Sequence, residues 1–116
     1  MKLDMFGHPI EIGNFIIYGS GRGEISYGVV SDITTEGKIK IKIVEAVFDY
    51  AQRDPQLTGW KTRILTLTNA VTLVVPIETY EVHNLPYYAS KQDLAFGFEQ
   101  KWRELYRDIN LKKAKN

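Results

Sequence analysis

The chain has 116 residues, of which 44% are apolar and 25% charged; its formal net charge is +1 and it contains no cysteine. A domain of this length buries about two-thirds of its unfolded surface, and the composition argues against disorder. The lack of cysteine excludes disulfides, thiolate catalysis and cysteine-ligated zinc. Because no apolar run approaches the ~20 residues of a membrane span and no signal peptide is evident, we expect a soluble cytoplasmic protein without a membrane partner.

The first residues predict short strands separated by glycine-rich turns. Residues 2–12 indicate a short strand, a turn at Gly7-His8-Pro9 and a return. A first full strand is predicted for residues 13–18. The loop 19–23 follows, with three glycines in five residues, and the chain returns through residues 25–27.

Residues 27–50 predict the central β-hairpin of the protein, with a turn at residues 34–37. After the turn, apolar and basic residues alternate as in a strand with one buried and one wet face: Ile39, Ile41 and Ile43 against Lys38, Lys40 and Lys42. We expect the isoleucines to face a closed interior and the lysines to face water or a partner.

The alternation changes phase at Ile43-Val44, after which the apolar positions are Val44, Ala46, Phe48 and Tyr50. A shift of one residue moves every following side chain to the opposite face. The strand therefore either bulges at this point or is covered by a second layer.

Residues 51–60 contain Pro55 and Gly59 and predict a loop. A strand follows over residues 61–68, where Leu65 and Leu67 share a face with Lys61 and Arg63, so that this strand either starts late or bulges.

Asn69-Ala70 indicates a two-residue reversal into a last strand, residues 71–75, which Pro76 ends because proline cannot donate to a ladder.

The C-terminal third predicts a linker, residues 77–89, and one amphipathic helix that begins after Ser90 as N-cap. The helix carries one apolar stripe: Leu94, Phe98, Trp102, Leu105, Tyr106 and Ile109. On the other face Glu99 and Arg103 have the spacing of an ion pair. We expect the helix to fray at Asn110, its tail to be loose, and its stripe to cover Val44 and the residues in phase with it.

These elements predict a mainly β (α+β) fold: a small five-stranded barrel over residues 1–77, with the linker and C-terminal helix, residues 78–116, packed on it in the same single domain. No internal repeat or low-complexity segment is present.

The first half resembles small phage-encoded proteins of unassigned function, through a pattern that consists here of Asp4, Gly7, Pro9, Ile10, Gly13, Asn14, Phe15 and Ile16. The segment Gly28-x-Val30-x-x-Ile33 is similar to the KOW motif of SH3-like barrels. This resemblance covers about residues 4–76 and implies an SH3-like barrel in the cytoplasm of a host cell. Such barrels bind nucleic acid, ribosomal or polymerase partners, or other proteins, and the fold alone does not choose among them.

The strongest candidate for a nucleic-acid site is the lysine face of the hairpin, which presents Lys38, Lys40 and Lys42, with roots about 6.6 Å apart, and which Arg22 could extend. Lys112, Lys113 and Lys115 add positive charge in the tail. The alternative is a solvated face whose lysines protect a strand edge from aggregation.

The loop around Gly21, Arg22 and Gly23 could hold a small phosphorylated ligand through backbone N–H groups, or be only a flexible connection. His8 and His83 lack partners at the spacing of metal ligands, so we expect no metal and no cofactor. Ser20 and Ser26 have no recognisable base, so we expect no enzymatic activity.

Three aromatic residues of the linker are candidates for contact with a protein: Tyr80, Tyr87 and Tyr88. The sequence thus predicts a non-enzymatic binding module that contacts nucleic acid through a basic strand face. The alternatives are a protein-binding factor that engages a host protein or assembles into a homo-oligomer through linker and helix, and a phosphate-binding loop.

Overall fold

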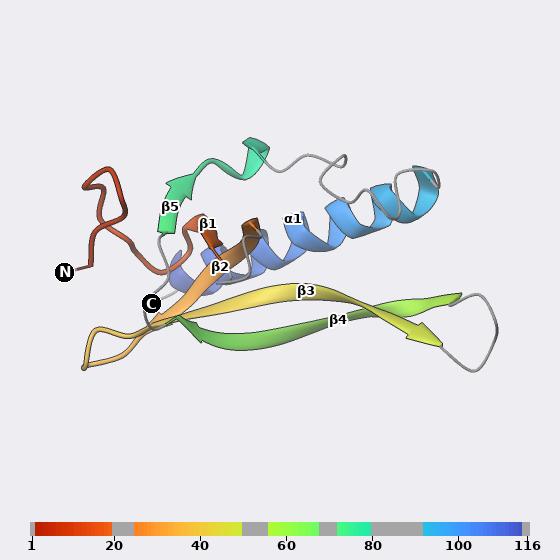
Figure 1. Cartoon of the computed structure of the whole chain (residues 1–116), viewed down its shortest axis with the longest axis horizontal. Coiled ribbons are helices and arrows are strands. Elements are labelled where there is room, and N and C mark those ends of the chain that lie inside the picture. The colour runs from red at the N-terminus through yellow and green to blue at the C-terminus, as the bar shows by residue number, and fades with distance from the viewer. Residues whose placement is uncertain (1, 20–24, 50–55, 68–71, 80–91, 115–116) are drawn as a thin grey trace.

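The computed structural model describes residues 2–19, 25–49, 56–67, 72–79 and 92–114. In Figure 1 a twisted sheet lies against one long helix. The elements are β1 (Phe15–Gly19), β2 (Ile25–Ile33), β3 (Ile39–Asp49), β4 (Gln56–Leu67), β5 (Thr72–Val75), a short 3₁₀ helix (Ile77–Thr79) and α1 (Gln92–Ala114). The prediction of a mainly β fold with a C-terminal helix is confirmed.

The strands form one antiparallel sheet in the order β4-β3-β2-β1-β5. The sheet is open, because β4 and β5 stand at opposite ends of this order and do not pair with each other in the described part of the chain. The prediction of a closed barrel is therefore not met, although the sheet has the number of strands that such a barrel needs.

The central hairpin is confirmed, with β2 and β3 as its strands. Its turn is closed by hydrogen bonds from the Thr34 N–H to the Lys38 carbonyl and from the Gly37 N–H to the Thr34 carbonyl, both 2.9 Å long. Gly37 has a φ of 84°, which a residue with a side chain rarely adopts. The turn thus depends on glycine at this position.

The change of phase in β3 is resolved by a second layer. Pairing with β4 is continuous through this point, with Ile43 opposite Arg63 and Val44 opposite Thr62, so no bulge lies there. Val44 is buried against α1, whereas Ile41 is buried on the opposite face. Helix α1 therefore covers Val44, as expected; the side chains of Ala46 and Phe48 and all of Tyr50 lie outside the described residues.

Each face of the sheet has its own core. The inner cluster consists of Ile10, Ile16, Tyr18, Val30, Ile39 and Ile41. The helix-side cluster consists of Phe15, Val29, Val44, Trp102, Leu105 and Ile109. Leu65 of β4 and Val74 of β5 both pack against the inner cluster although three strands separate them, which requires the sheet to curl around that cluster.

Strand β4 is longer than the sequence predicts. The prediction of a loop over residues 51–60 is wrong for residues 56–60, because β4 begins at Gln56 and pairs with the far end of β3. Of the two explanations for its register, a late start is wrong because the strand starts early. A register shift is present, but between Gly59 and Leu57, and pairing over residues 61–67 is continuous. Leu67 packs on the inner cluster, whereas Lys61 lies beyond it on the same face, where its Nζ is 3.8 Å from the Glu45 carboxylate.

The N-terminal segment is fixed by the buried carboxylate of Asp4. One oxygen accepts hydrogen bonds from the N–H groups of Phe6 (2.9 Å) and His8 (2.8 Å), and the other accepts one from Val74 N–H (3.0 Å). Burial alone would raise the pKa of Asp4, but the backbone donors, with the charge of His8, hold it below its ordinary value of 3.8. The Asp4–Pro9 part of the resemblance thus builds a turn held against β5.

Candidate nucleic-acid interface

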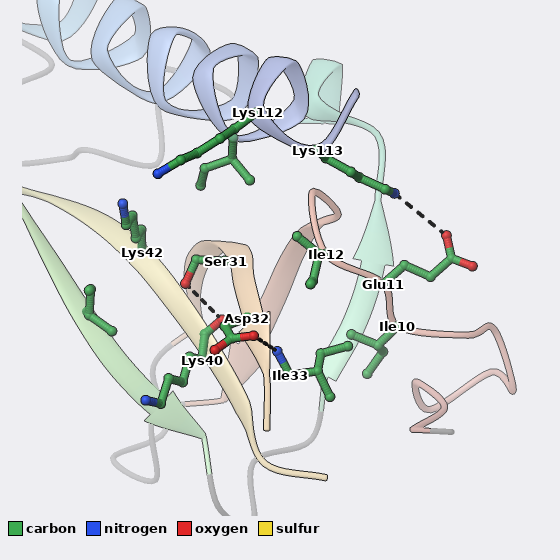
Figure 2. A pocket seen from close by; sticks show the side chains of 12 residues that line it. Ile10, Glu11, Ile12, Ser31, Asp32, Ile33, Lys40, Lys42, Lys112 and Lys113 are labelled. Carbon is green, nitrogen blue, oxygen red and sulfur yellow. Dashed lines mark hydrogen bonds and ion pairs between the residues drawn. The ribbon is translucent and has the colours of Figure 1, made fainter. Parts of the chain in front are cut away.

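The lysines that the sequence places in two distant segments meet at one open pocket of about 990 Å³, here named the lysine groove. Lys40 and Lys42 come from β3, and Lys112 and Lys113 come from the last turn of α1. In Figure 2 the side chains of Lys42 and Lys112 extend into the same space from opposite sides. Four lysines from segments about 70 residues apart thus line the groove; the ammonium groups of Lys42 and Lys112 point toward each other, whereas those of Lys40 and Lys113 point away from them (Figure 2).

The register of the sheet explains why Lys42 faces the helix. Lys42 pairs with Val29, and paired residues project from the same face of a sheet. Val29 is fully buried in the helix-side cluster, so Lys42 shares the face that α1 covers. The face of β3 that the sequence predicts to be solvated therefore lies opposite α1 at Lys42, and not only in water.

The position of the helix lysines depends on Asn110. Its Nδ2 donates hydrogen bonds to the carbonyls of Gly13 (3.0 Å) and Tyr106 (2.8 Å), and the neighbouring Ile109 is buried. The sequence predicts that the helix frays at Asn110 and that its tail is loose. This is wrong, because the helix continues to Ala114 and the Asn110 side chain holds its last turns against the sheet. Lys112 and Lys113 consequently stand over the groove.

The floor and walls of the groove are largely apolar. The register of β2 and β3 shifts between Val30 and Asp32, and this irregularity turns both Ser31 and Asp32 to the groove. The Ser31 hydroxyl donates to the Lys40 carbonyl at 3.3 Å. Five isoleucines complete the lining: Ile10, Ile12, Ile33, Ile64 and Ile109.

The charges of the groove are unequally compensated. The Nζ of Lys113 lies 4.0 Å from the Glu11 carboxylate. Lys40, Lys42 and Lys112 form no ion pair with any residue that the structure describes. Four ammonium groups against the two carboxylates of Glu11 and Asp32 leave an excess of two positive charges.

The structure separates Lys38 from the other two lysines of the predicted face. Lys38 precedes β3, its side chain is exposed, and its Nζ lies 3.6 Å from the Glu36 carboxylate. It does not line the groove. The remaining predicted positions lie outside the described residues: Gly21, Arg22, Gly23, Tyr80, His83, Tyr87, Tyr88, Ser90 and Lys115.

Aromatic side chains near the lysines could stack on bases only if they were exposed, and they serve the core instead. Tyr18 is buried in the inner cluster, and Tyr27 stacks on Phe15 with ring centroids 5.3 Å apart. Trp60 is partly buried against the helix-side cluster, and Trp102 packs within it, as expected. No described aromatic side chain lines the groove, so the groove offers charge and apolar surface without a stacking platform.

Sequence reasoning missed the contribution of the helix to this site. The signal was present in the spacing, because Lys112 and Lys113 follow the buried Ile109 by three and four residues and thus share its side of the helix. In a loose tail, as predicted, Lys112 and Lys113 would add only diffuse positive charge; the ordered helix end places them at the groove.

Two further findings concern the described residues alone. They contain no group of three or more His, Cys, Asp or Glu side chains that could hold a metal ion. They also contain no helix that combines the length and the apolar character needed to cross a membrane.

Comparisons with protein-family models, with curated proteins and with solved structures found no match to this chain. The resemblance to phage-encoded SH3-like proteins therefore stays a prediction.

Proposed function

We propose that the protein is a non-enzymatic module that binds nucleic acid through the phosphate backbone, in the lysine groove. One observation carries this proposal: Lys40 and Lys42 of β3 and Lys112 of α1 line one pocket, Lys42 and Lys112 extend into the same space, and none of the three has a carboxylate partner among the described residues. The groove replaces the predicted Lys38–Lys42 strand face as the binding surface.

Phosphate is the ligand that suits a groove with an excess of two positive charges and with three lysines that form no ion pair among the described residues. Lysine contacts to phosphate supply affinity and orientation without reading sequence. Because no described aromatic side chain or guanidinium lines the groove, direct recognition of bases has no evident source there. Binding independent of sequence is the consequence, and it fits an SH3-like module that acts in the cytoplasm of a phage host, which is the setting that the resemblance implies.

The test is the salt dependence of binding to a fluorescent oligonucleotide of mixed sequence. Three phosphate contacts predict that affinity falls about 20- to 40-fold between 50 and 200 mM salt. Lys42→Glu and Lys112→Glu should each weaken binding and reduce the slope by about one. Lys38→Glu is the matched control, since it changes charge equally but lies outside the groove and should leave the slope unchanged.

Two results would reject the proposal. Binding that does not change with salt would exclude phosphate contacts as its source. Equal losses in Lys42→Glu, Lys112→Glu and Lys38→Glu would indicate a response to overall charge rather than a site in the groove.

A protein segment is a second candidate for the groove, and its isoleucine floor favours it. Ile12 and Ile33 are only partly buried beneath the lysines, and a phosphate backbone makes little use of such apolar surface. An acidic amphipathic peptide could pair its carboxylates with the lysines and pack its apolar side chains on the isoleucines. In that case binding would respond to Ile33→Ser as strongly as to Lys42→Glu, whereas nucleic-acid binding should respond mainly to Lys42→Glu.

A further inference from the structure

The two edge strands of the sheet, β5 and β4, differ in whether another described segment covers them. The edge formed by β5 is covered by the N-terminal segment, since the Val74 N–H donates to Asp4 Oδ2 and the Met5 N–H donates to the Thr72 carbonyl, each at 3.0 Å. An uncovered strand edge is a template for pairing with another chain. The N-terminal segment therefore removes one of the two templates.

The other edge belongs to β4, which spans 12 residues, Gln56–Leu67. It pairs with β3 along this length, and no other segment in the described part of the chain forms a backbone hydrogen bond with it. Figure 1 shows β4 along the margin of the molecule, with β3 between it and α1. Within the described residues, this long strand thus has no backbone partner on its outer edge.

The side chains of β4 offer weak protection against pairing. Lysine and arginine on an edge strand normally discourage it, but here Lys61 and Arg63 share the carboxylate of Glu45, at 3.8 and 3.1 Å, which offsets one of their two charges. Between them and the end of the strand stands Ile64, which is 59% exposed. An exposed isoleucine in the middle of a long edge strand is the pattern of a pairing surface.

We propose that two copies of this chain pair through β4, antiparallel, with Ile64 facing Ile64 of the second copy at the twofold axis. This register places Thr62 opposite Thr66 and Arg63 opposite Leu65, so that no like charges are opposed. A register centred on Arg63 would instead oppose two guanidinium groups, which is unfavourable. Registers centred on Lys61 or Thr62 would likewise oppose like charges. The register centred on Ile64 opposes none and also joins the two exposed isoleucines, and this favours a second copy as the occupant of the edge.

The pairing has a consequence for the lysine groove, which rests on the proposed function. Ile64 belongs to the wall of the groove, and residues paired across two strands project from the same face. The two grooves would lie on one side of a continuous ten-stranded sheet and meet at the isoleucine contact. A dimer would then present twice the number of lysines to one nucleic-acid strand.

The absence of cysteine makes a direct test simple. In Ile64→Cys, mild oxidation should form a disulfide between copies, because side chains paired across strands lie close enough for this bond. Thr35→Cys, in the exposed turn between β2 and β3, is the matched control and should not cross-link at the same concentration. Sedimentation of the unmodified chain over a range of concentrations should show a dimer, and Ile64→Glu should remove it.

The outcomes separate this inference from the proposed function. A chain that is monomeric at all concentrations, or equal cross-linking of the two cysteine variants, overturns pairing through β4 and leaves binding in a single groove standing. A dimer that is lost in Ile64→Glu and kept in Lys42→Glu supports pairing, even if the oligonucleotide does not bind. A dimer that persists in Ile64→Glu places the interface elsewhere and overturns the inference.

Discussion

The side chain of Asn110 is hydrogen-bonded to the carbonyl of Gly13, 97 residues earlier in the chain, at 3.0 Å. This bond joins the last turns of α1 to the segment that enters β1, and it fixes the height of Lys112 and Lys113 above the sheet. The same Nδ2 donates to the Tyr106 carbonyl, one turn back, so both of its hydrogens are used.

Removal of this anchor should affect both stability and the groove. Asn110→Ala leaves the Gly13 carbonyl without its donor, and we expect a loss of about 1–2 kcal/mol in the free energy of unfolding. The control is Leu111→Ala, because Leu111 is 54% exposed and should change stability by less than about 0.5 kcal/mol. Urea denaturation measures both. Equal effects of the two variants would show that the anchor is not what holds the helix end.

A second prediction concerns the close approach of β2 and β3 at Gly28. A Cβ at this position would lie 2.6 Å from Ile41 Cδ1, and Ile41 is fully buried. Gly28→Ala should therefore destabilise the protein by about 1–3 kcal/mol. Gly19→Ala is the control, since a Cβ there meets no atom within 4 Å.

The mechanism of this loss can be tested by a double mutant. Ile41→Val removes Cδ1, the nearest of the three Ile41 atoms that a Cβ on residue 28 would meet, so Gly28→Ala should cost less in the Ile41→Val background than alone. Strictly additive losses in the free energy of unfolding would point to a cause other than this contact.

The third prediction follows from the lowered pKa of Asp4. Because the folded state holds this pKa below the ordinary value of 3.8, the carboxylate stabilises the fold above that pH, and the contribution is lost as pH falls through the folded pKa. Asp4→Asn should be less stable than the parent chain at neutral pH. The difference in unfolding free energy should shrink progressively below pH 3.8. A difference that is constant with pH would contradict the role of the ionised carboxylate.

The fourth prediction concerns the acidic residue that holds one lysine of the groove. Glu11→Gln releases Lys113, so affinity for the oligonucleotide should rise and the salt slope should steepen by about one. Glu36→Gln is matched to it, because it releases Lys38, which lies outside the groove, and it should leave the slope unchanged. Fluorescence anisotropy at several salt concentrations measures both. A rise of the same size in the two variants would argue against the groove.

The sequence alone determined those features that depend on residues close together in the chain. The alternation of Ile39 and Ile41 with lysines, and the turn that ends at Gly37, predicted the central hairpin correctly, because the period of a strand and the positive φ of a turn are properties of adjacent residues. The ion pair of Glu99 and Arg103, at 3.0 Å, and the burial of Trp102 followed in the same way from helical spacing.

The tertiary structure decided what depends on residues far apart. Partners in β3 carry β4 back to Gln56, despite a composition typical of a loop. The Gly13 carbonyl keeps Asn110 in the helix, and the packing of Ile109 brings Lys112 over Lys42. Helical spacing places Lys112 on the side of Ile109, but which strand that side meets leaves no trace in the sequence, since the energy comes from burial and hydrogen bonds between segments that meet only after folding. The candidate site therefore belongs to the fold, although each of its lysines is visible in the sequence.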